Sequence, residues 1–151
     1  DGTHAPRDYQ PEADVTPWLK RLGLAELGDK YPRQLSGGQR QRTAIARTLA
    51  LKPDLLLMDE PFSSLDAPTR ESMQNLILEL QAEQDLTLVI VTHAIEEAAF
   101  IGRKILLLGP PPNSQPVIMD NSATGQPEFR HSTVYLTLCR ELRQRMEGLG
   151  S

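Results

Sequence analysis

The sequence predicts an α/β protein built on a mostly parallel sheet. Two short and continuously apolar runs, at residues 54–59 and 86–92, are typical of strands that such a sheet buries on both faces. Between them, residues 67–82 place Met73, Leu76, Ile77 and Leu80 at helical spacing, which predicts an amphipathic helix. Strands that alternate with helices favour β-α-β units over an all-helical or all-β fold.

The N-terminal part of the chain is expected to be helical after an irregular start. Residues 1–17 are polar and rich in proline, and apolar spacing then predicts a helix within 12–27 that Gly23 ends. Trp18 lies on the apolar face of that helix and is expected in the core. A second helix is predicted over 39–51, with one face formed by Ala44, Ile45, Thr48 and Leu49.

The C-terminal part is expected to add a short helix, a strand pair and a closing helix. The short helix spans 94–101, and strands at 104–108 and 117–119 flank a Gly-Pro-Pro-Pro loop that excludes a helix. Residues 133–146 predict an amphipathic helix with apolar residues Tyr135, Leu138, Cys139, Leu142 and Met146. Cys139 is therefore expected to be a buried structural thiol.

Composition narrows the class of protein. A chain of 151 residues with 39% hydrophobic residues can bury a core, which excludes general disorder. A net charge of −4 argues against a dedicated nucleic-acid binder. The single cysteine cannot form an internal disulfide, and the apolar runs are shorter than a membrane span or a signal-peptide core requires. We therefore expect a cytoplasmic protein.

Two adjacent carboxylates follow the first predicted strand. Asp59 and Glu60 repel each other there, so a folding role for both is weak. Mg²⁺ would account for one, because it takes few carboxylates and keeps waters and phosphate oxygens as other ligands. The second could then act as the general base on an attacking water. The alternative is a helix N-cap pair or a solvated turn.

Ser36, Gly37, Gly38 and Gln39 precede a predicted helix. Ser36 can cap that helix, and the free N–H groups of a helix N-terminus can bind an anion. The alternative is an ordinary capped helix with a flexible entry. The block 31–50 carries four arginines and no acidic residue, although each arginine is expected to be solvated or structural. His93 follows the second strand and is either a phosphate ligand or a structural residue.

Four segments, taken in order, carry a family resemblance. They are Leu-Ser-Gly-Gly-Gln-Arg-Gln-Arg (35–42), Leu-Leu-Leu-Met-Asp-Glu-Pro (55–61), Ser-Ser-Leu-Asp (63–66) and Val-Thr-His (91–93). They resemble the signature motif, Walker B strand, D-loop and H-loop of ATP-binding cassette (ABC) ATPases. Further residues, including Trp18-Leu19 and Lys30-Tyr31-Pro32, look like the ATPase subunits of bacterial importers, and the Gly109–Pro112 loop and closing helix are similar to those of the nitrate, sulfonate and taurine group.

The resemblance implies a P-loop NTPase-like α/β fold and a role for each matching residue. Asp59 would hold Mg²⁺, directly or through water, and Glu60 would be the general base for the water that attacks the γ-phosphate of ATP. His93 would contact that phosphate. Residues of the signature motif would act in trans on nucleotide bound to a second ATPase subunit, and Asp66 would couple the two sites; the signature residues are Ser36, Gly37, Gly38 and Gln39.

The sequence also departs from the family pattern. No Gly-x-x-x-x-Gly-Lys-Ser/Thr phosphate loop occurs, since none of the four lysines follows a glycine, and we find no Q-loop glutamine or adenine-stacking aromatic residue. We therefore expect an incomplete domain, the C-terminal portion of such an ATPase. Part of the helical subdomain would span 1–38, the ATPase core 39–120, and a linker and helix 121–151. Alone, this portion is expected to be inactive and to self-associate through an exposed strand edge.

Three functions follow from the sequence. The first is an ATP-hydrolysing subunit that powers solute uptake with transmembrane permease subunits, at the inner face of the cell membrane and without nucleic acid. The second is an ABC-type ATPase of DNA repair or translation, although no heptad run or basic block supports it. The third is a non-catalytic interaction fragment.

Overall fold

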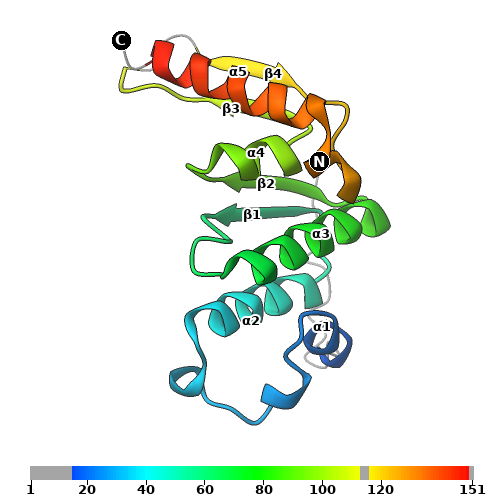
Figure 1. Ribbon diagram of the computed structural model, residues 1–151. Coiled ribbons are helices and arrows are strands. Elements are labelled where there is room, and N and C mark those ends of the chain that lie inside the picture. Colours follow the sequence, from blue (N-terminus) through cyan, green and yellow to red (C-terminus); the bar gives the residue numbers. More distant parts are fainter. Residues whose placement is uncertain (1–14, 113–115, 150–151) are drawn as a thin grey trace, which may run out of the picture. The chain divides into compact units, whose positions relative to one another are not determined.

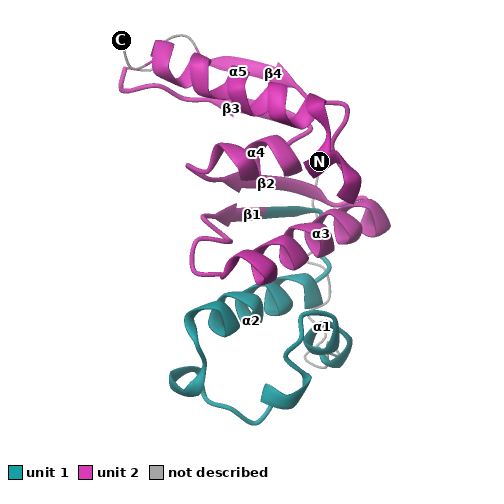
Figure 2. Cartoon of the chain, viewed as in Figure 1, with its two compact units in different colours: residues 1–56 teal, residues 57–151 magenta. Residues whose placement is uncertain are grey.

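A computed structural model describes residues 15–112 and 116–149. The chain divides into two compact units, residues 1–56 and residues 57–151, which are described in turn (Figure 2). Within the described ranges, no helix is long and apolar enough to cross a membrane.

The first unit is helical. It contains α1 (Thr16–Arg21), two short 3₁₀-helices at Ala25–Leu27 and Pro32–Gln34, and α2 (Gly37–Ala50) (Figure 1). As predicted, Gly23 ends the first helix, with a left-handed φ of +65° that costs glycine little. A Cβ at this position would lie 3.1 Å from Nη1 of Arg42, which donates a hydrogen bond of 2.8 Å to the carbonyl of Leu22. This contact joins the end of α1 to α2.

Some expectations for the first unit were wrong. The helix expected within 12–27 is only six residues long, because the chain turns at Gly23, and residues 12–14 lie outside the described part of the chain. Trp18 is half-buried rather than in the core. Ala44 is exposed and Ala46 is buried in its place, so the buried face of α2 is Ile45, Ala46 and Leu49.

The second unit contains the predicted β-α-β unit followed by a short helix, a hairpin and two further helical segments. β1 (Leu55–Asp59), which begins at the end of the first unit, pairs with β2 (Thr87–Val91), and α3 (Ala67–Gln84) forms the crossover between these parallel strands (Figure 1). After α4 (Ile95–Ile101), β3 (Lys104–Leu107) pairs antiparallel with β4 (Val117–Asp120), from Lys104 opposite Asp120 to Leu107 opposite Val117. A 3₁₀-helix (Pro127–His131) and α5 (Thr133–Leu149) follow. The predicted α/β class is confirmed.

The expectation that β1 and β2 are buried on both faces was wrong. Burial alternates along β1, where Leu56 and Met58 are buried but the side chain of Leu57 is 67% exposed. On β2, Val89 and Val91 are also exposed. The alternating pattern, with half-buried residues between exposed ones on β2, indicates that the described residues cover only one face of this two-stranded sheet. A continuous apolar run cannot distinguish this arrangement from full burial.

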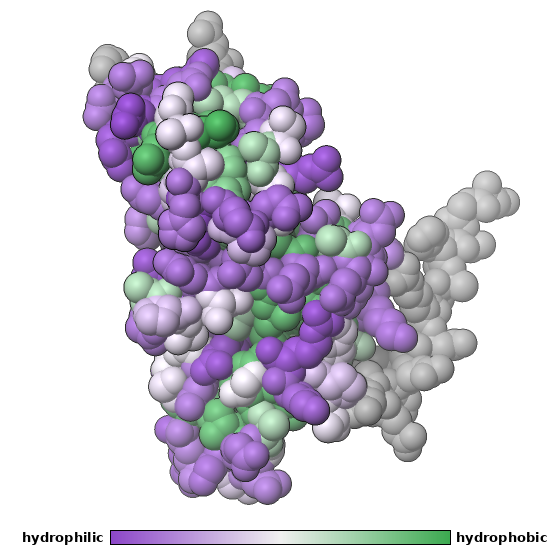
Figure 3. All heavy atoms as spheres, turned by 45° about the vertical axis from the view of Figure 1, so that its right-hand side comes forward, coloured by the Kyte–Doolittle hydropathy of each residue, from purple (hydrophilic) through white to green (hydrophobic). Residues whose placement is uncertain are grey.

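Apolar surface extends to the second strand pair. Ile105, Leu107 and Met119 are buried, whereas Leu106 and Ile118, on the opposite face of the hairpin, are 54% and 64% exposed. Figure 3 shows one face of the molecule on which apolar atoms reach the surface among hydrophilic side chains. Both strand pairs therefore expose apolar side chains, and exposed apolar surface of this kind marks a binding face or an aggregation site.

The closing helix α5 packs against α4. It buries Tyr135, Cys139 and Leu142, so the prediction of a buried thiol is confirmed, whereas Met146 is exposed because it lies in the last turn. The ring of Phe129 meets that of Tyr135 edge to face at 5.6 Å between centroids. The Tyr135 hydroxyl donates to the carbonyl of Glu96 on α4 at 3.3 Å.

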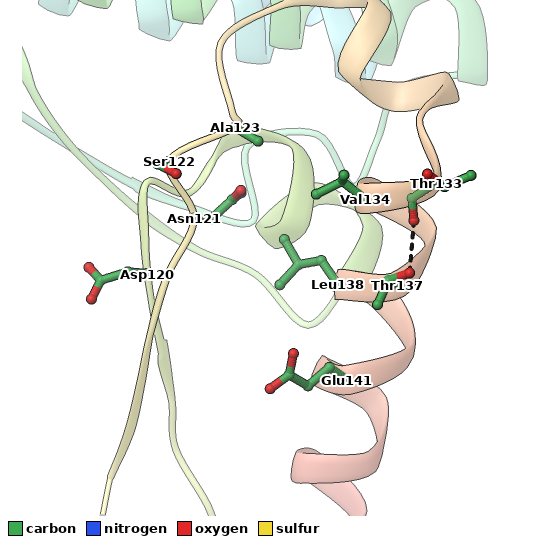
Figure 4. A pocket seen from close by; sticks show the side chains of 9 residues that line it. All are labelled: Asp120, Asn121, Ser122, Ala123, Thr133, Val134, Thr137, Leu138 and Glu141. Atoms are coloured by element: carbon green, nitrogen blue, oxygen red, sulfur yellow. Dashed lines mark hydrogen bonds between the residues drawn. The ribbon is translucent and has the colours of Figure 1, made fainter.

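A hollow of about 350 Å³ opens between α5 and the segment that follows β4 (Figure 4). Its polar groups are already engaged, since the Asn121 amide donates to the carbonyls of Ala99 and Gly102, and the Thr137 hydroxyl donates to the carbonyl of Thr133. None of the residues predicted to carry chemistry lines it. The hollow is therefore a packing feature of the C-terminal helix.

Burial raises the pKa of Tyr135 to about 12, and the neighbouring Cys139 adds to the shift. Because the neutral phenol is the form that the fold stabilises, this contribution to the free energy of unfolding is fully present below pH 10, the ordinary pKa of tyrosine, and is lost as the pH rises towards 12. We expect denaturant unfolding of the wild type to show this loss of stability, and Tyr135→Phe to show a smaller one. An equal loss in both proteins would contradict the assignment.

Candidate functional site

The loop that follows β1 carries both adjacent carboxylates and is anchored by buried apolar residues. Phe62 is fully buried, and Leu65 is 6% exposed. Glu60 has a left-handed φ of +46°, which is uncommon for a residue with a Cβ and is found most often where the surrounding structure holds it in place. Its backbone N–H donates to the carbonyl of Val91 at 2.9 Å, so this turn is fixed to the end of β2.

The side chain of Glu60 meets His93. Oε1 of Glu60 lies 2.6 Å from Nδ1 of His93 and accepts the backbone N–H of His93 at 2.9 Å. A carboxylate only accepts hydrogen bonds, so the imidazole hydrogen in this contact must sit on Nδ1. The His93 side chain is 84% exposed and that of Glu60 is 32% exposed, so both are open to a ligand. Two residues that are 33 positions apart in the sequence are thus brought together.

Asp59 lies at the carboxyl end of β1, the edge at which open parallel sheets place their ligands. Its side chain is exposed, and within the described ranges it makes no hydrogen bond or ion pair. No group of three or more histidine, cysteine or acidic side chains gathers into a metal site among these residues. An uncommitted carboxylate fits Mg²⁺, which takes one or two carboxylates and completes its shell with water and phosphate oxygens.

Asp66 caps the N-terminus of α3. Its carboxylate accepts the backbone N–H of Thr69 at 3.0 Å and the Thr69 hydroxyl at 2.9 Å. The side chain predicted to couple two sites therefore already has a structural role within the chain. The cap ends the loop that begins at Glu60 and fixes where α3 starts.

The glycine pair of the first unit opens α2, as predicted. Ser36 caps the helix, because its hydroxyl accepts the backbone N–H of Gln39 at 3.2 Å while Oε1 of Gln39 accepts the backbone N–H of Ser36 at 2.8 Å. Gly37 and Gly38 form the first turn and are half-buried. The predicted cap is confirmed, and it starts the helix at Gly37 rather than at Gln39.

Two of the arginines near this motif are structural, as expected. Nη1 of Arg40 donates to the carbonyl of Leu35 at 2.6 Å, and Nη1 of Arg42 holds the carbonyl of Leu22. Arg33 lies over the ring of Tyr31, with 5.9 Å from its guanidinium carbon to the ring centroid. These contacts hold the loop before α2 and the end of α1.

A polar group next to His93 was not predicted from the sequence. Glu97 on α4 is buried, and its Oε2 accepts the Thr92 hydroxyl at 2.8 Å. Oε1 of Glu97 lies 3.7 Å from Nε of Arg70 on α3. No spacing in the sequence links positions 70 and 97, and a glutamate in the first turn of a helix is ordinary there. The only available indication was that Glu97 falls on the apolar face of its short helix.

Two substitutions at Asp66 distinguish the stability contributed by the helix cap from that contributed by the charge. We expect Asp66→Ala to lower the free energy of unfolding by about 1 kcal/mol, because it leaves the Thr69 N–H without a partner, and Asp66→Asn to cost less because the amide oxygen still caps. Urea unfolding of both variants measures the difference. Equal stability of the alanine variant and the wild type would show that the cap contributes nothing.

Comparison with known proteins places these features in a family. The ABC transporter family profile matches residues 3–63. The chain is 52% identical over 94 residues to the taurine import ATP-binding protein TauB of Chromobacterium violaceum, which covers 62% of this chain and 36% of that protein. It is 49% identical over 106 residues to TauB of Ruegeria pomeroyi, covering 70% of this chain and 40% of the relative. The chain thus spans less than half the length of these curated relatives.

Solved structures show the same fold. A metal-chelate type ABC transporter in an inward-facing conformation matches 93% of this chain and 52% of its own, with a TM-score of 0.65 and 27% identity. An ATP-binding cassette in a dimeric post-hydrolysis state, bound to ADP and Pi, matches 78% of this chain and 51% of its own, with a TM-score of 0.58 and 34% identity. With the motif order, the β-α-β unit and the Glu60–His93 contact, these matches support the resemblance of this chain to the ATPases of ABC importers.

Proposed function

We propose that this chain is part of an ATP-hydrolysing subunit that powers an ABC importer. The observation that carries the proposal is the contact between Glu60 and His93 at the carboxyl end of β1 and β2, beside the uncommitted carboxylate of Asp59. A carboxylate with one oxygen held by His93 and a side chain open to solvent can polarise a water molecule. The identity to taurine import ATP-binding proteins supports the transport role.

Each residue of this cluster has one task in the proposal. Asp59 is the residue that would hold Mg²⁺, which supplies charge neutralisation to the phosphates when bound. Glu60 takes the proton of the attacking water. His93 donates from Nδ1 to Glu60, so it can donate from Nε2 to a phosphate oxygen only as the imidazolium, in which both ring nitrogens carry hydrogen. The hydrogen bonds from His93 fix the orientation of the Glu60 carboxylate at this turn.

The signature motif of the first unit serves a second ATPase subunit in this proposal. The capping box holds the first turn of α2 rigid, so Ser36, Gly37, Gly38 and Gln39 present a fixed set of hydrogen-bond donors to phosphate bound on the partner. Asp66 lies in the loop that couples the two nucleotides. The dimeric cassette bound to ADP and Pi, which resembles this chain at 34% identity, supports such a pair.

The remaining partners follow from the relatives. We propose transmembrane permease subunits, a location at the inner face of the cell membrane, and a small sulfonate such as taurine as the transported solute, since the relatives are named for taurine import. The DNA-repair or translation alternative has no supporting observation in the structure. Nucleic acid is not a partner in this proposal.

The proposed chemistry is tested by comparing Glu60 with an exposed glutamate of α3. In the complete protein with its permease in proteoliposomes, we expect Glu60→Gln to lower taurine-stimulated ATP hydrolysis about 100-fold or more, because the general base is lost. Glu71→Gln, an exposed position on α3, is the matched control and should leave the rate unchanged. The 151 residues alone should show no turnover, because they contain no phosphate loop.

Three results would contradict this function. The first is a complete protein that hydrolyses ATP equally well with Glu60→Gln. The second is turnover by the 151 residues alone that disappears in Glu60→Gln. The third is hydrolysis stimulated by DNA or RNA and not by solute and permease.

We also propose that residues 1–151 alone self-associate through the face and edges of the β1–β2 sheet that the described residues leave uncovered. Leu57, Val89 and Val91 are exposed there, and unpaired strand edges beside apolar surface invite pairing with a second copy. Light scattering at about 100 µM should show dimers or larger species. Val89→Lys should restore the monomer and Leu136→Lys, an exposed leucine of α5, should not. A wild-type chain that stays monomeric would contradict this.

A further inference from the structure

The buried carboxylate of Glu97 contacts Thr92, the residue that precedes His93 of the candidate site. Glu97 is 6% exposed, and burial of a charge is costly unless other groups satisfy it. In the part of the chain that the structure describes, its two oxygens have different partners: Oε2 accepts the Thr92 hydroxyl at 2.8 Å, and Oε1 faces Nε of Arg70 at 3.7 Å. An apolar side chain at this position would cost less free energy to bury than a carboxylate, so the presence of Glu97 here requires an explanation.

The hydroxyl of Thr92 links the carboxylate of Glu97 to the backbone at Ala94. A hydroxyl has one hydrogen, and here it is donated to Glu97, which leaves the oxygen lone pairs to accept the backbone N–H of Ala94 at 3.1 Å. The backbone N–H of His93, between these residues, is held by Oε1 of Glu60. Consecutive amides on both sides of the His93 side chain are therefore fixed from two directions.

Arg70 joins the same carboxylate to the loop of Asp66. Its Nη2 donates to the carbonyl of Leu65 at 3.0 Å, and its backbone N–H donates to the carbonyl of Asp66 at 2.8 Å. The guanidinium thus lies between the carbonyl next to Asp66 and the carboxylate of Glu97. Glu97 therefore contacts Thr92 directly and the loop of Asp66 only through Arg70.

We propose that Glu97 is a positioning residue that acts through Thr92 to orient His93 towards Glu60, and through Arg70 to hold the Asp66 loop at a fixed distance from His93. This inference rests on the proposed ATPase function, because its consequence is measured in hydrolysis. Glu97 contacts neither Glu60 nor His93 directly, so it acts on the orientation of His93 and not on the reacting atoms. It should change the rate of the chemical step more than the binding of ATP.

The test compares two substitutions at position 92 in the complete protein with its permease. Thr92→Val keeps the shape and removes the hydroxyl, whereas Thr92→Ser keeps the hydroxyl. We expect Thr92→Val to lower kcat about tenfold with KM for ATP changed less than twofold, and Thr92→Ser to retain most of kcat. Thr137→Val, in which the lost hydroxyl bonds only within α5, is the matched control and should behave as wild type.

Glu97→Gln provides a second variant and a measurement independent of hydrolysis. It should lower kcat like Thr92→Val, and the double variant should fall no further, because both act through one hydrogen bond. Without nucleotide, hydrogen–deuterium exchange at the amides of His93 and Ala94 should be about tenfold faster in Thr92→Val and Glu97→Gln than in Thr92→Ser.

The outcomes separate this inference from the function on which it rests. A wild type without ATPase activity overturns the proposed function. An active wild type in which Thr92→Val and Glu97→Gln keep wild-type kcat overturns only the positioning role. If kcat falls as far in Thr92→Ser as in Thr92→Val, the role of Thr92 is purely structural and the proposal is overturned as well. The same holds if lower thermal stability accounts for the lost activity in all variants. If Thr92→Val does not fold, Glu97→Gln decides by the same criteria.

Discussion

The hydrogen bonds from His93 to Oε1 of Glu60 are the interaction on which the described site depends. They join the ends of β1 and β2, whose backbones are also linked by the N–H of Glu60 and the carbonyl of Val91. Glu60 adopts a left-handed backbone to reach this position, at a cost of about 1–2 kcal/mol. Buried Phe62 and Leu65 hold the loop in place, so the fold offsets strain at the site with packing beside it.

The two units divide the proposed chemistry. The first presents a rigid helix N-terminus, whose capping box uses Ser36 and Gln39 to satisfy each other's backbone N–H groups. The second holds the carboxylates and His93. Neither unit has the lysine-bearing loop that grips phosphates in P-loop enzymes, because no such pattern occurs in the sequence.

Both strand pairs expose apolar side chains on one face. The β1–β2 sheet and the hairpin both alternate between buried and exposed apolar side chains, as the contrast of Met58 with Leu57 and of Met119 with Ile118 shows. A water-facing sheet surface normally carries polar residues at the exposed positions. The leucines and valines in those positions indicate that the sequence is suited to a sheet covered on both faces. The apolar character of these strand residues thus agrees with the expected burial on both faces, but their exposure in the structure does not.

The amino-acid sequence was enough to predict the element types, the capping of α2 by Ser36, the α/β class and the identity of the motif residues. Periodicity and caps are local, and motif order is written directly in the chain. The three-dimensional structure was needed to show that Glu60 meets His93, that Ala46 rather than Ala44 is buried, and that Glu97 contacts Thr92 and Arg70. Contacts between residues distant in sequence depend on how the strands pair and the helices cross, and no local spacing encodes that geometry.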